Sequence, residues 1–405
     1  MTTTSESPLS LYQLLDPEVL ADPYPLYRGL READPVHWDP YLHAWVVTSY
    51  PEAVTVLRRF SAQRTPTPEK LAELGMPALG SIAAVMVRQM LFLDPPAHTR
   101  VRRLASVAFT PRRVQRLRAH IEQIVDALID EVIDRGEMEV MEDLANPLPA
   151  IVTAEMLGVP TEDHRRLKDW SQAFAEMLGN FQHNPGRAAR VADSLQEMTV
   201  YFQEAVRRQA TEPTEGLVNA LATAEVDGDR LSEDEVVANI IVTLVGGQET
   251  TTNLIGNGLL TLLRHPESIA RLRREPGLMP DAVEELLRYE SPSQHTARLA
   301  PEDVELGGRR IARGQAVIAV MGAANRDPAR FPDPDRLDLG RADNRHLAFG
   351  WASHFCFGAP LARIEGQLAF SALLRRLPRL ALATDALTWR ANLGLRGLTA
   401  LPVTF

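Results

Sequence analysis

The only cysteine of the chain, Cys356, lies in the segment FGWASHFCFGAPLARIEG (residues 349–366). Pro360 follows it at a position typical of the first turn of a helix, and apolar residues then recur at helical spacing. A thiol just before a helix N-terminus lies near free N–H groups and the positive end of the helix dipole, and both favour the thiolate. The segment therefore predicts a nucleophile or a metal ligand, although a lone cysteine can also be a small buried hydrophobe.

Glu249 and Thr250 form a second candidate site, within the stretch GGQETTTN (residues 246–253) at the centre of a long apolar segment. Gly246 and Gly247 together cost about 2 kcal/mol relative to alanines in a helix interior. A polar turn weakened by glycines lowers the stability of a buried helix, so its presence needs a functional or structural reason. The motif therefore indicates either a functional turn or a kink that packs on a neighbouring element.

A third candidate is the pair Glu285 and Arg288, in EELLRYESPSQHTARLA (residues 284–300). Residues three apart on a helix share a face, so the two side chains can meet. On a surface, such an ion pair contributes less than about 1 kcal/mol. The pair therefore carries little meaning without the other motifs.

These side chains need helices to position them. A helix is expected over residues 233–264, because Ser232 and Glu235 have the spacing of a capping box. At 1.5 Å per residue it would be roughly 45–50 Å long, enough to cross a whole domain. A second helix is expected over residues 110–136, with Gly136 at its end.

Strand patterns are fewer and lie near the two ends of the chain. They occur at residues 44–50, in a hairpin-like segment at 303–321 with Gly307 and Gly308 at its turn, and at 396–405. Strands this few and scattered do not build a doubly wound sheet. The pattern predicts a mainly α protein with small β-sheets.

Composition narrows the function classes. The chain has 405 residues, 45% of them hydrophobic, and a formal net charge of −10. The negative charge argues against nucleic acid as a partner, and a single cysteine fits a reducing, cytoplasmic compartment. No signal peptide and no apolar window of about 18 residues is evident, so no membrane span is expected. No linker or repeat marks a boundary, which favours one large domain.

Together these motifs resemble those of the cytochrome P-450 family. NRDPARFPDPDRLDLGR (residues 325–341) is similar to the meander that precedes the cysteine loop in that family, and LDPPAHTRVRRLASVAFTPRRV (93–114) to the helix over a heme edge. The resemblance runs from about residue 17 to the C-terminus, with all motifs in family order. It implies a single P-450 domain over residues 17–405, after an N-terminal segment 1–16, shaped as a triangular helical prism with a long central helix over the heme.

The resemblance implies heme b as the cofactor, with the Cys356 thiolate as the iron ligand. Glu249 and Thr250 would deliver protons to bound dioxygen, with the two preceding glycines letting the helix open locally. A buried cluster of Glu285, Arg288 and Arg336 would fix the meander. The residues implied around the heme are Phe349, Gly350 and Gly358 in the loop, and His98, Arg102, Arg298 and His354 at the propionates.

The sequence departs from the family pattern at three positions. Ala352 stands where the loop usually has glycine, beside the bulky Trp351, and Gln248 stands where a histidine usually precedes the acid. Alanine is the least costly replacement for glycine unless the position needs a positive φ. Heme binding is therefore expected to survive.

The family's substrate-contacting regions map onto mostly apolar positions, which predict a mostly apolar small molecule as substrate. Each such side chain can equally be ordinary core. Four polar side chains, Gln294, His295, Gln182 and Asn392, could orient a polar tip of the substrate. The apolar candidates are Ile82, Val85, Met86, Phe174, Met177, Leu178, Phe181, Leu244, Val245, Leu393 and Leu395.

The implied reaction is hydroxylation or epoxidation with O2 and two electrons from NAD(P)H, with secondary metabolism as its expected setting. No reductase-like segment is evident in the chain, so ferredoxin and ferredoxin reductase are the expected partners of a monomeric enzyme. The arginines 102, 103, 112 and 113 could supply a positive docking patch for an acidic ferredoxin.

Three alternatives remain open from the sequence. A peroxide-driven peroxygenase would share the heme, but such relatives generally replace the acid–threonine pair. A non-catalytic binding protein would explain the apolar helices but not that pair. A cysteine hydrolase with His354 as base is disfavoured, because side chains two residues apart on an extended loop point to opposite faces.

Overall fold

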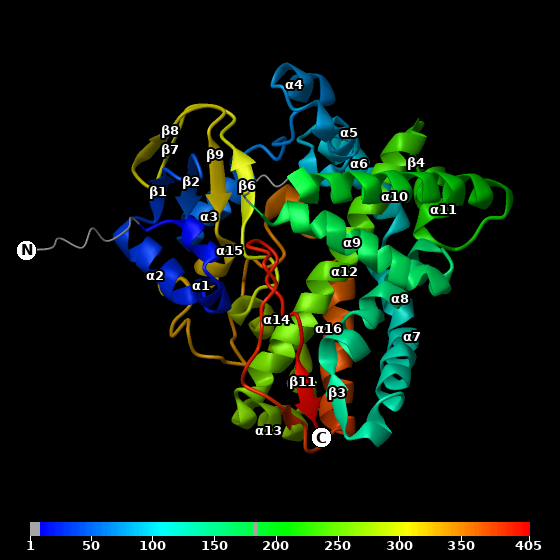
Figure 1. Ribbon diagram of the computed structural model, residues 1–405, viewed down its shortest axis with the longest axis vertical. Helices are drawn as coiled ribbons and strands as arrows, with labels where there is room; N and C mark the ends of the chain where they lie inside the picture. The colour runs from blue at the N-terminus through cyan, green and yellow to red at the C-terminus, as the bar shows by residue number, and fades with distance from the viewer. Residues whose placement is uncertain (1–8, 181–184) are drawn as a thin grey trace, which may run out of the picture.

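The computed structural model describes residues 9–180 and 185–405, and most of this part of the chain is helical. Short strands form small sheets beside the helices (Figure 1). The expected mainly α fold with small sheets is thus confirmed. The helices are α1 (Pro17–Ala21), α2 (Tyr24–Ala33), α3 (Tyr50–Arg59), α4 (Pro68–Glu73), α5 (Gly80–Met86), α6 (Ala97–Ala108), α7 (Pro111–Asp130), α8 (Pro147–Leu157), α9 (His164–Leu178), α10 (Pro185–Thr211), α11 (Leu217–Thr223), α12 (Glu233–Leu263), α13 (Pro266–Arg274), α14 (Met279–Tyr289), α15 (Met321–Ala324) and α16 (Ala359–Arg376).

The long central helix is α12, and it begins where the sequence predicts. The Ser232 side chain accepts from the Glu235 N–H, and the Glu235 carboxylate accepts from the Ser232 N–H, so the capping box is complete. The helix continues through Gly246 and Gly247 without a break, so the expected local opening is not present. In Figure 1, α12 passes through the middle of the helical part of the molecule, where it packs against α8, α9, α10, α14 and α16.

The helix expected over residues 110–136 is shorter than predicted. It begins at Pro111 behind the Thr110 cap and ends at Asp130. A short 3₁₀ turn follows, and Gly136, in the left-handed region at φ 70°, ends that turn rather than the helix.

The largest sheet has four strands in the order β1 (Val36–Asp39), β2 (Ala44–Val47), β9 (Ala316–Ala319) and β6 (Thr296–Leu299). Only part of the segment expected as a hairpin forms one: β7 (Val304–Leu306) pairs with β8 (Arg309–Ile311), whereas β9 pairs with β2 and β6. A further sheet joins β10 (Ala381–Leu382), β11 (Pro402–Thr404) and β3 (Glu137–Glu139), and the short strands β4 (Glu225–Val226) and β5 (Asp229–Arg230) form a ribbon.

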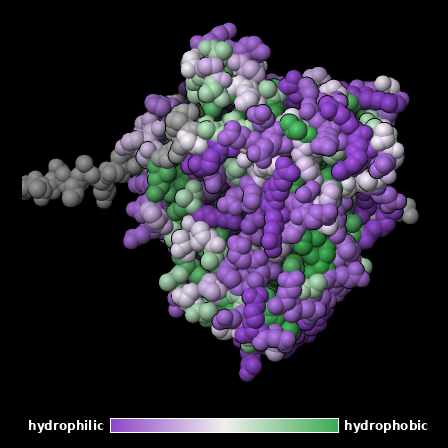
Figure 2. Space-filling view, turned by 45° about the vertical axis from the view of Figure 1, so that its right-hand side comes forward, coloured by the Kyte–Doolittle hydropathy of each residue, from purple (hydrophilic) through white to green (hydrophobic). Residues whose placement is uncertain are grey.

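The molecular surface in view is mostly hydrophilic, with hydrophobic residues gathered only in small areas (Figure 2). Within residues 9–180 and 185–405, no helix combines the length and the apolar character that crossing a membrane requires. Apolar side chains are instead concentrated inside, where one large cluster surrounds α12.

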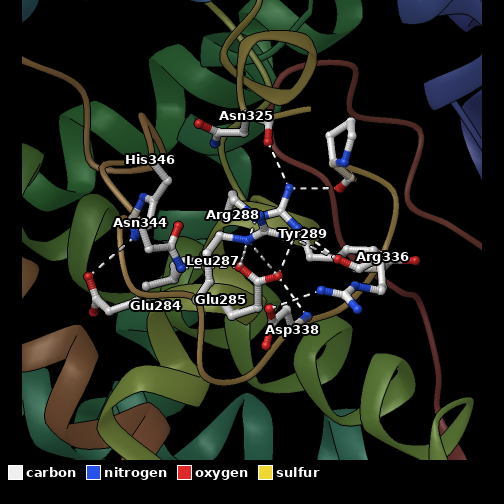
Figure 3. Close-up of polar contacts among 12 residues, drawn as sticks. Glu284, Glu285, Leu287, Arg288, Tyr289, Asn325, Arg336, Asp338, Asn344 and His346 are labelled. Atoms are coloured by element: carbon white, nitrogen blue, oxygen red, sulfur yellow. Dashed lines mark hydrogen bonds and ion pairs between the residues drawn. The ribbon is translucent and has the colours of Figure 1, made fainter. Parts of the chain in front are cut away.

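A buried ionic cluster links α14 to the segment before Cys356 (Figure 3). Arg288 donates to both carboxylate oxygens of Glu285 at 2.8 Å, and neither side chain is exposed. Arg288 also donates to the carbonyls of Asn325 and Pro334, at 2.9 and 2.8 Å. This much of the predicted cluster is present, and it fixes the meander to α14.

Arg336 takes part differently from what we expected. It contributes its carbonyl to Arg288, while its exposed side chain pairs with Asp338. The second guanidinium of the cluster comes instead from Arg341, whose side chain is 9% exposed and lies 3.2 Å from Glu285. Asn344 completes the set by donating to the same carboxylate. The meander brings Arg341 inward and leaves the Arg336 side chain in solvent.

This arrangement predicts unequal effects of two arginine substitutions. Arg341→Gln should lower the free energy of unfolding by about 2–3 kcal/mol, because a buried carboxylate loses a charged hydrogen-bond partner while keeping Arg288. Arg336→Gln should cost less than about 1 kcal/mol, as for other exposed pairs. Urea unfolding of both variants measures the difference. Equal losses would contradict the assignment of Arg341 to the cluster.

Candidate functional site

The loop that carries Cys356 folds back on itself before α16. The Cys356 N–H donates to the carbonyl of Phe349 at 2.8 Å, and Gly350, at φ 71°, makes the turn between them. Helix α16 starts at Ala359 with Pro360 in its first turn, one residue earlier than the sequence suggests. The thiol is therefore presented at the start of a helix, as predicted.

Electrostatics at Cys356 is a balance of opposing effects. Burial raises the pKa of the Cys356 thiol, while hydrogen bonds from the N–H groups of Gly358 and Ala359 and the charge of Arg102 act to lower it. The net direction is upward, because the effect of burial exceeds the stabilisation of the thiolate that the helix start provides. Coordination to a metal ion deprotonates a thiol outright, and the neighbouring donors would then stabilise the thiolate.

Ala352 adopts the left-handed conformation, at φ 56°. This is the case in which alanine is not a neutral replacement for glycine, since its Cβ costs roughly 1–2 kcal/mol in this region. The turn Ala352–His354 forms nevertheless. The loop thus keeps its shape at the cost of local strain.

Four predicted residues meet beside the loop. The rings of His98, on α6, and His354 lie 4.2 Å apart, and the Arg102 guanidinium donates to the carbonyl of Phe355 at 2.8 Å. Arg298, on β6, is 4% exposed. Burial, with the charges of His98 and Arg298, lowers the pKa of His354 to about 3. The cluster therefore accumulates positive charge in a partly desolvated place.

Several donors in this cluster have no partner. Within the described residues, both ring nitrogens of His98 and Nε of Arg298 are buried without a hydrogen bond. Buried polar atoms are almost always paired in folded proteins. The donor set therefore fits a ligand that carries negatively charged oxygens.

The polar turn of α12 is buried and ion-paired. Glu249 is 4% exposed, and its Oε2 lies 2.7 Å from Nη1 of Arg390. Burial raises the pKa of the Glu249 carboxyl, while Arg390 and Lys168 act to lower it. The net effect raises the pKa of the Glu249 carboxyl, so this group takes up a proton more readily than an exposed glutamate does.

Thr250 bonds within its own helix, because its hydroxyl donates to the carbonyl of Gly246 at 2.8 Å. Its oxygen keeps lone pairs that can accept a hydrogen bond. Gly246 itself is exposed in the middle of this largely buried helix, and a Cβ added there would meet no atom within 4 Å. Open space therefore lies beside the acid–threonine pair.

The same hydrophobic cluster contains the cysteine loop and the middle of α12, through Phe349, Cys356, Leu244 and Val245. A Cβ added at Gly358 would also meet open space. These features fit a flat, apolar metal cofactor that bears carboxylates. The thiol would bind the metal, the open space at the two glycines would admit the apolar ring, and the unpartnered donors would bind the carboxylates.

Comparison with known proteins decides the family. The family model described as Cytochrome P450 matches residues 67–379 of this chain. The chain belongs to the cytochrome P450 family. P450 enzymes are monooxygenases that carry heme on a cysteine thiolate, and the resemblance seen in the sequence is thereby confirmed.

Individual relatives agree over almost the whole length. The "Biotin biosynthesis cytochrome P450" of Bacillus subtilis (strain 168) is 39% identical over 392 residues, which cover 96% of this chain and 97% of that protein. The "6-deoxyerythronolide B hydroxylase" of Saccharopolyspora erythraea is 40% identical over 394 residues, covering 94% and 96%. The crystal structure of P450BioI with acyl carrier protein ligated by hexadec-9Z-enoic acid has a TM-score of 0.91 at 38% identity and covers 96% of this P450 and 99% of that chain.

Most predicted pocket residues lie on three helices that pack together, since α5 and α9 both contact α12. Phe181 and Gln182 lie outside the described residues. Burial lowers the pKa of His295 to about 4, so its ring is neutral. The residues that share the large cluster around α12 are Ile82, Val85, Met86, Phe174, Met177, Leu178, Leu244, Val245 and Leu395.

Three other predicted pocket residues have structural partners. Leu393 belongs to a separate apolar cluster with Leu11 and Leu14 at the N-terminal side of the molecule. The Gln294 amide donates to the carbonyl of Ser291 at 2.7 Å. The Asn392 amide donates to the carbonyl of Ala175 on α9 and accepts from backbone N–H groups of its own turn. These contacts give the three side chains roles in the fold, and their contact with substrate stays a prediction.

Arg390 and Lys168 are the site residues that sequence reasoning missed. Arg390 lies 141 positions from Glu249 along the chain. No local pattern links two residues so far apart. The only signal was the buried acid itself, which demands a cation from somewhere in the fold.

Proposed function

We propose that this P450 binds heme b through Cys356 and uses O2 with two electrons from NAD(P)H to hydroxylate or epoxidise a mostly apolar small molecule of secondary metabolism. Residues 17–405 form the domain that carries out this reaction. The observation that carries the proposal is the buried Glu249, ion-paired to Arg390 and next to Thr250 beside open space.

The heme-binding roles follow from the donors around the loop. Cys356 is the iron ligand, flanked by Phe349, Gly350 and Gly358. His98, Arg102, Arg298 and His354 bind the two propionates. The propionates supply the anionic oxygens that the buried, unpartnered nitrogens of His98 and Arg298 lack. Bound in this way, the heme supplies the iron whose thiolate ligand favours cleavage of the O–O bond.

Proton delivery is the part of the reaction that this chain performs itself. Glu249 takes a proton from the solvent side and passes it through water toward the heme pocket, while Arg390 holds the carboxylate when it is charged. The Thr250 hydroxyl, directed at Gly246, offers its oxygen as an acceptor that positions water. The neighbouring apolar side chains exclude other water.

The acid–threonine pair also separates this proposal from a peroxide-driven enzyme. A peroxygenase receives oxygen already reduced and needs no protons delivered to dioxygen. Burying a carboxylate with a dedicated guanidinium partner is costly, and a peroxide-driven reaction gives no reason for it. Reductive activation of O2 is therefore favoured.

The substrate follows from the pocket and from two relatives. The walls that α5, α9 and α12 offer are mostly apolar, and burial of apolar surface contributes roughly 25 cal/mol per Å². One relative is named for the hydroxylation of 6-deoxyerythronolide B, and P450BioI was crystallised with a fatty acyl-ligated carrier protein. We infer a substrate with a large apolar body for this P450 as well.

Replacing Thr250 tests the proton-delivery step. In Thr250→Ala, heme content and reduction should stay near wild type, while NAD(P)H consumption is diverted to hydrogen peroxide and product falls roughly tenfold or more. Added peroxide should restore part of the turnover, because it bypasses proton delivery. Product, peroxide and NAD(P)H are measured together.

Thr252→Ala is the matched control, since that hydroxyl donates to the carbonyl of Ala145 and not to Gly246. It should keep full coupling of reductant to product. If Thr250→Ala also keeps full coupling, Thr250 has no part in proton delivery.

The electron donor in this proposal is an acidic ferredoxin, served by a ferredoxin reductase. Arg102 and Arg103 lie on α6, and Arg102 donates to the carbonyl of Phe355, an exposed residue of the cysteine loop. Arg113 lies in the first turn of α7, while the side chain of Arg112 is outside the part of the chain that the structure describes. These arginines offer a positive area to an acidic partner.

Charge reversal measures the contribution of this area. Arg103→Glu with Arg113→Glu should slow ferredoxin-driven reduction about tenfold at low ionic strength, and the difference should shrink with added salt. Arg310→Glu, on the exposed β7–β8 hairpin, should have no effect. An unchanged rate in the double variant would move the docking area elsewhere.

A further inference from the structure

Arg64 is a guanidinium near the predicted propionate residues that no motif singles out. It lies between α3 and α4, with its Cζ 4.6 Å from the centroid of the Phe92 ring. Its Nη1 is buried and has no hydrogen-bond partner in the part of the chain that the structure describes. A stacked guanidinium with an enclosed, unpaired N–H group is a candidate binding group for an anion.

The backbone places Arg64 beside the strand that carries Arg298. Ser61 and Leu299, on β6, exchange both backbone hydrogen bonds, at 2.9 and 3.0 Å. Asp94 ties the same segment down by accepting from the N–H of Ala62 at 2.8 Å. Three residues beyond the bridge, Arg64 therefore lies near the start of α6, the helix that carries His98.

The electrostatics agrees with this placement. Burial and the charge of Arg298 lower the pKa of Arg64 to about 9, and the charge of Arg64 is felt at His354. The cluster at the cysteine loop therefore extends to a third arginine.

The fixed charges of the extended cluster do not balance. Among the described residues that act on one another here, Arg64, Arg102 and Arg298 are guanidinium groups and Asp94 is the carboxylate. The surplus equals the charge of two propionates. Without Arg64, the two propionates and Asp94 would leave a buried negative charge unpaired, which is strongly unfavourable.

We propose that Arg64 binds a heme propionate, as a fifth residue beside His98, Arg102, Arg298 and His354. The proposal rests on heme b as the proposed cofactor. A free carboxylate on the substrate presents the same chemistry to Arg64. The charge balance favours the propionate, because the two propionates use the whole positive surplus and leave none for a further anion.

The rate of heme loss tests this assignment without any turnover. Heme transfer from the holoenzyme to an excess of apomyoglobin should be at least tenfold faster in Arg64→Met than in wild type, because a charge-assisted hydrogen bond is lost. Arg64→Lys should give an intermediate rate. Arg59→Met, which removes an exposed arginine paired with Glu302, should match wild type.

A ligand titration separates the two sources of the carboxylate. Myristic acid and 1-tetradecanol are titrated into each holoenzyme and followed by the shift of the Soret band. The ratio of their two Kd values should be the same in Arg64→Met and wild type. Weakened binding of the acid alone, with heme loss unchanged, would assign Arg64 to a substrate carboxylate and overturn the proposal.

Heme loss at the wild-type rate in Arg64→Met would overturn it too. The pyridine hemochromogen spectrum of the wild-type protein identifies heme b independently. A failure of the proposed cofactor is therefore seen before any Arg64 variant is made.

Discussion

The buried pair of Glu285 and Arg288 holds the cysteine loop in place through a continuous set of hydrogen bonds. Arg288 binds the carbonyl of Asn325, and the Asn325 side chain accepts from the N–H of Leu347 at 2.7 Å. Leu347 in turn accepts from Gly350, where the turn toward Cys356 begins. The ion pair joins residues three apart on one helix. These hydrogen bonds connect it to the loop that carries Cys356, more than sixty positions later in the chain. The ion pair itself adds little to the free energy of folding, because the desolvation of two charges offsets most of their attraction. Its main contribution is to hold the loop in this geometry.

The neighbouring Glu284 holds the other end of the same loop. It accepts from Arg363 on α16 at 2.6 and 2.7 Å and from His346 before the loop. Burial acts to raise the pKa of Glu284, but the hydrogen bonds from Arg363 and His346 lower it to about 2. Consecutive acids on α14 therefore hold the loop from both sides. This leaves the sulfur at a fixed place relative to α12.

On the α12 side of the site, the cost of burying a charge is offset by an ion pair. Helix α12 is apolar for most of its length, yet it carries a buried carboxylate at its centre. Arg390 provides the compensating charge from the C-terminal hairpin, whose backbone pairs Arg390 with Gly397 and whose Asn392 is bonded to α9. The position of the Glu249 carboxylate therefore depends on this hairpin, because the hairpin holds Arg390 in place. The same burial raises the pKa of the Glu249 carboxyl, and the proposed proton delivery uses this property.

Local signals explain what the sequence could predict. The ends of α12 and α16 depend on a capping box and a proline, which act within one turn, and both helices begin within a residue of the expected place. The family motifs bring together His98, Arg298, His354 and Cys356 because each lies in a contiguous, recognisable segment.

Non-local packing explains what the sequence could not predict. Whether Arg336 or Arg341 turns inward depends on how the meander folds over α14, and the choice of Arg390 depends on a hairpin far along the chain. Leu393 is apolar like its neighbours, yet it packs on the N-terminal side. Nothing in its residue type distinguishes the two environments. Ala352 shows the same limit for the backbone, since its positive φ belongs to the loop rather than to alanine.

The central claim is that Cys356 is the thiolate ligand of a heme iron. The most direct measurement is the absorption spectrum of the reduced protein with and without carbon monoxide, for wild type and Cys356→Ser. The wild-type adduct should show the strongly red-shifted Soret band of thiolate-ligated heme, and the variant should lose it. A wild-type adduct with an unshifted Soret band, or a red-shifted band that persists in Cys356→Ser, would contradict the account.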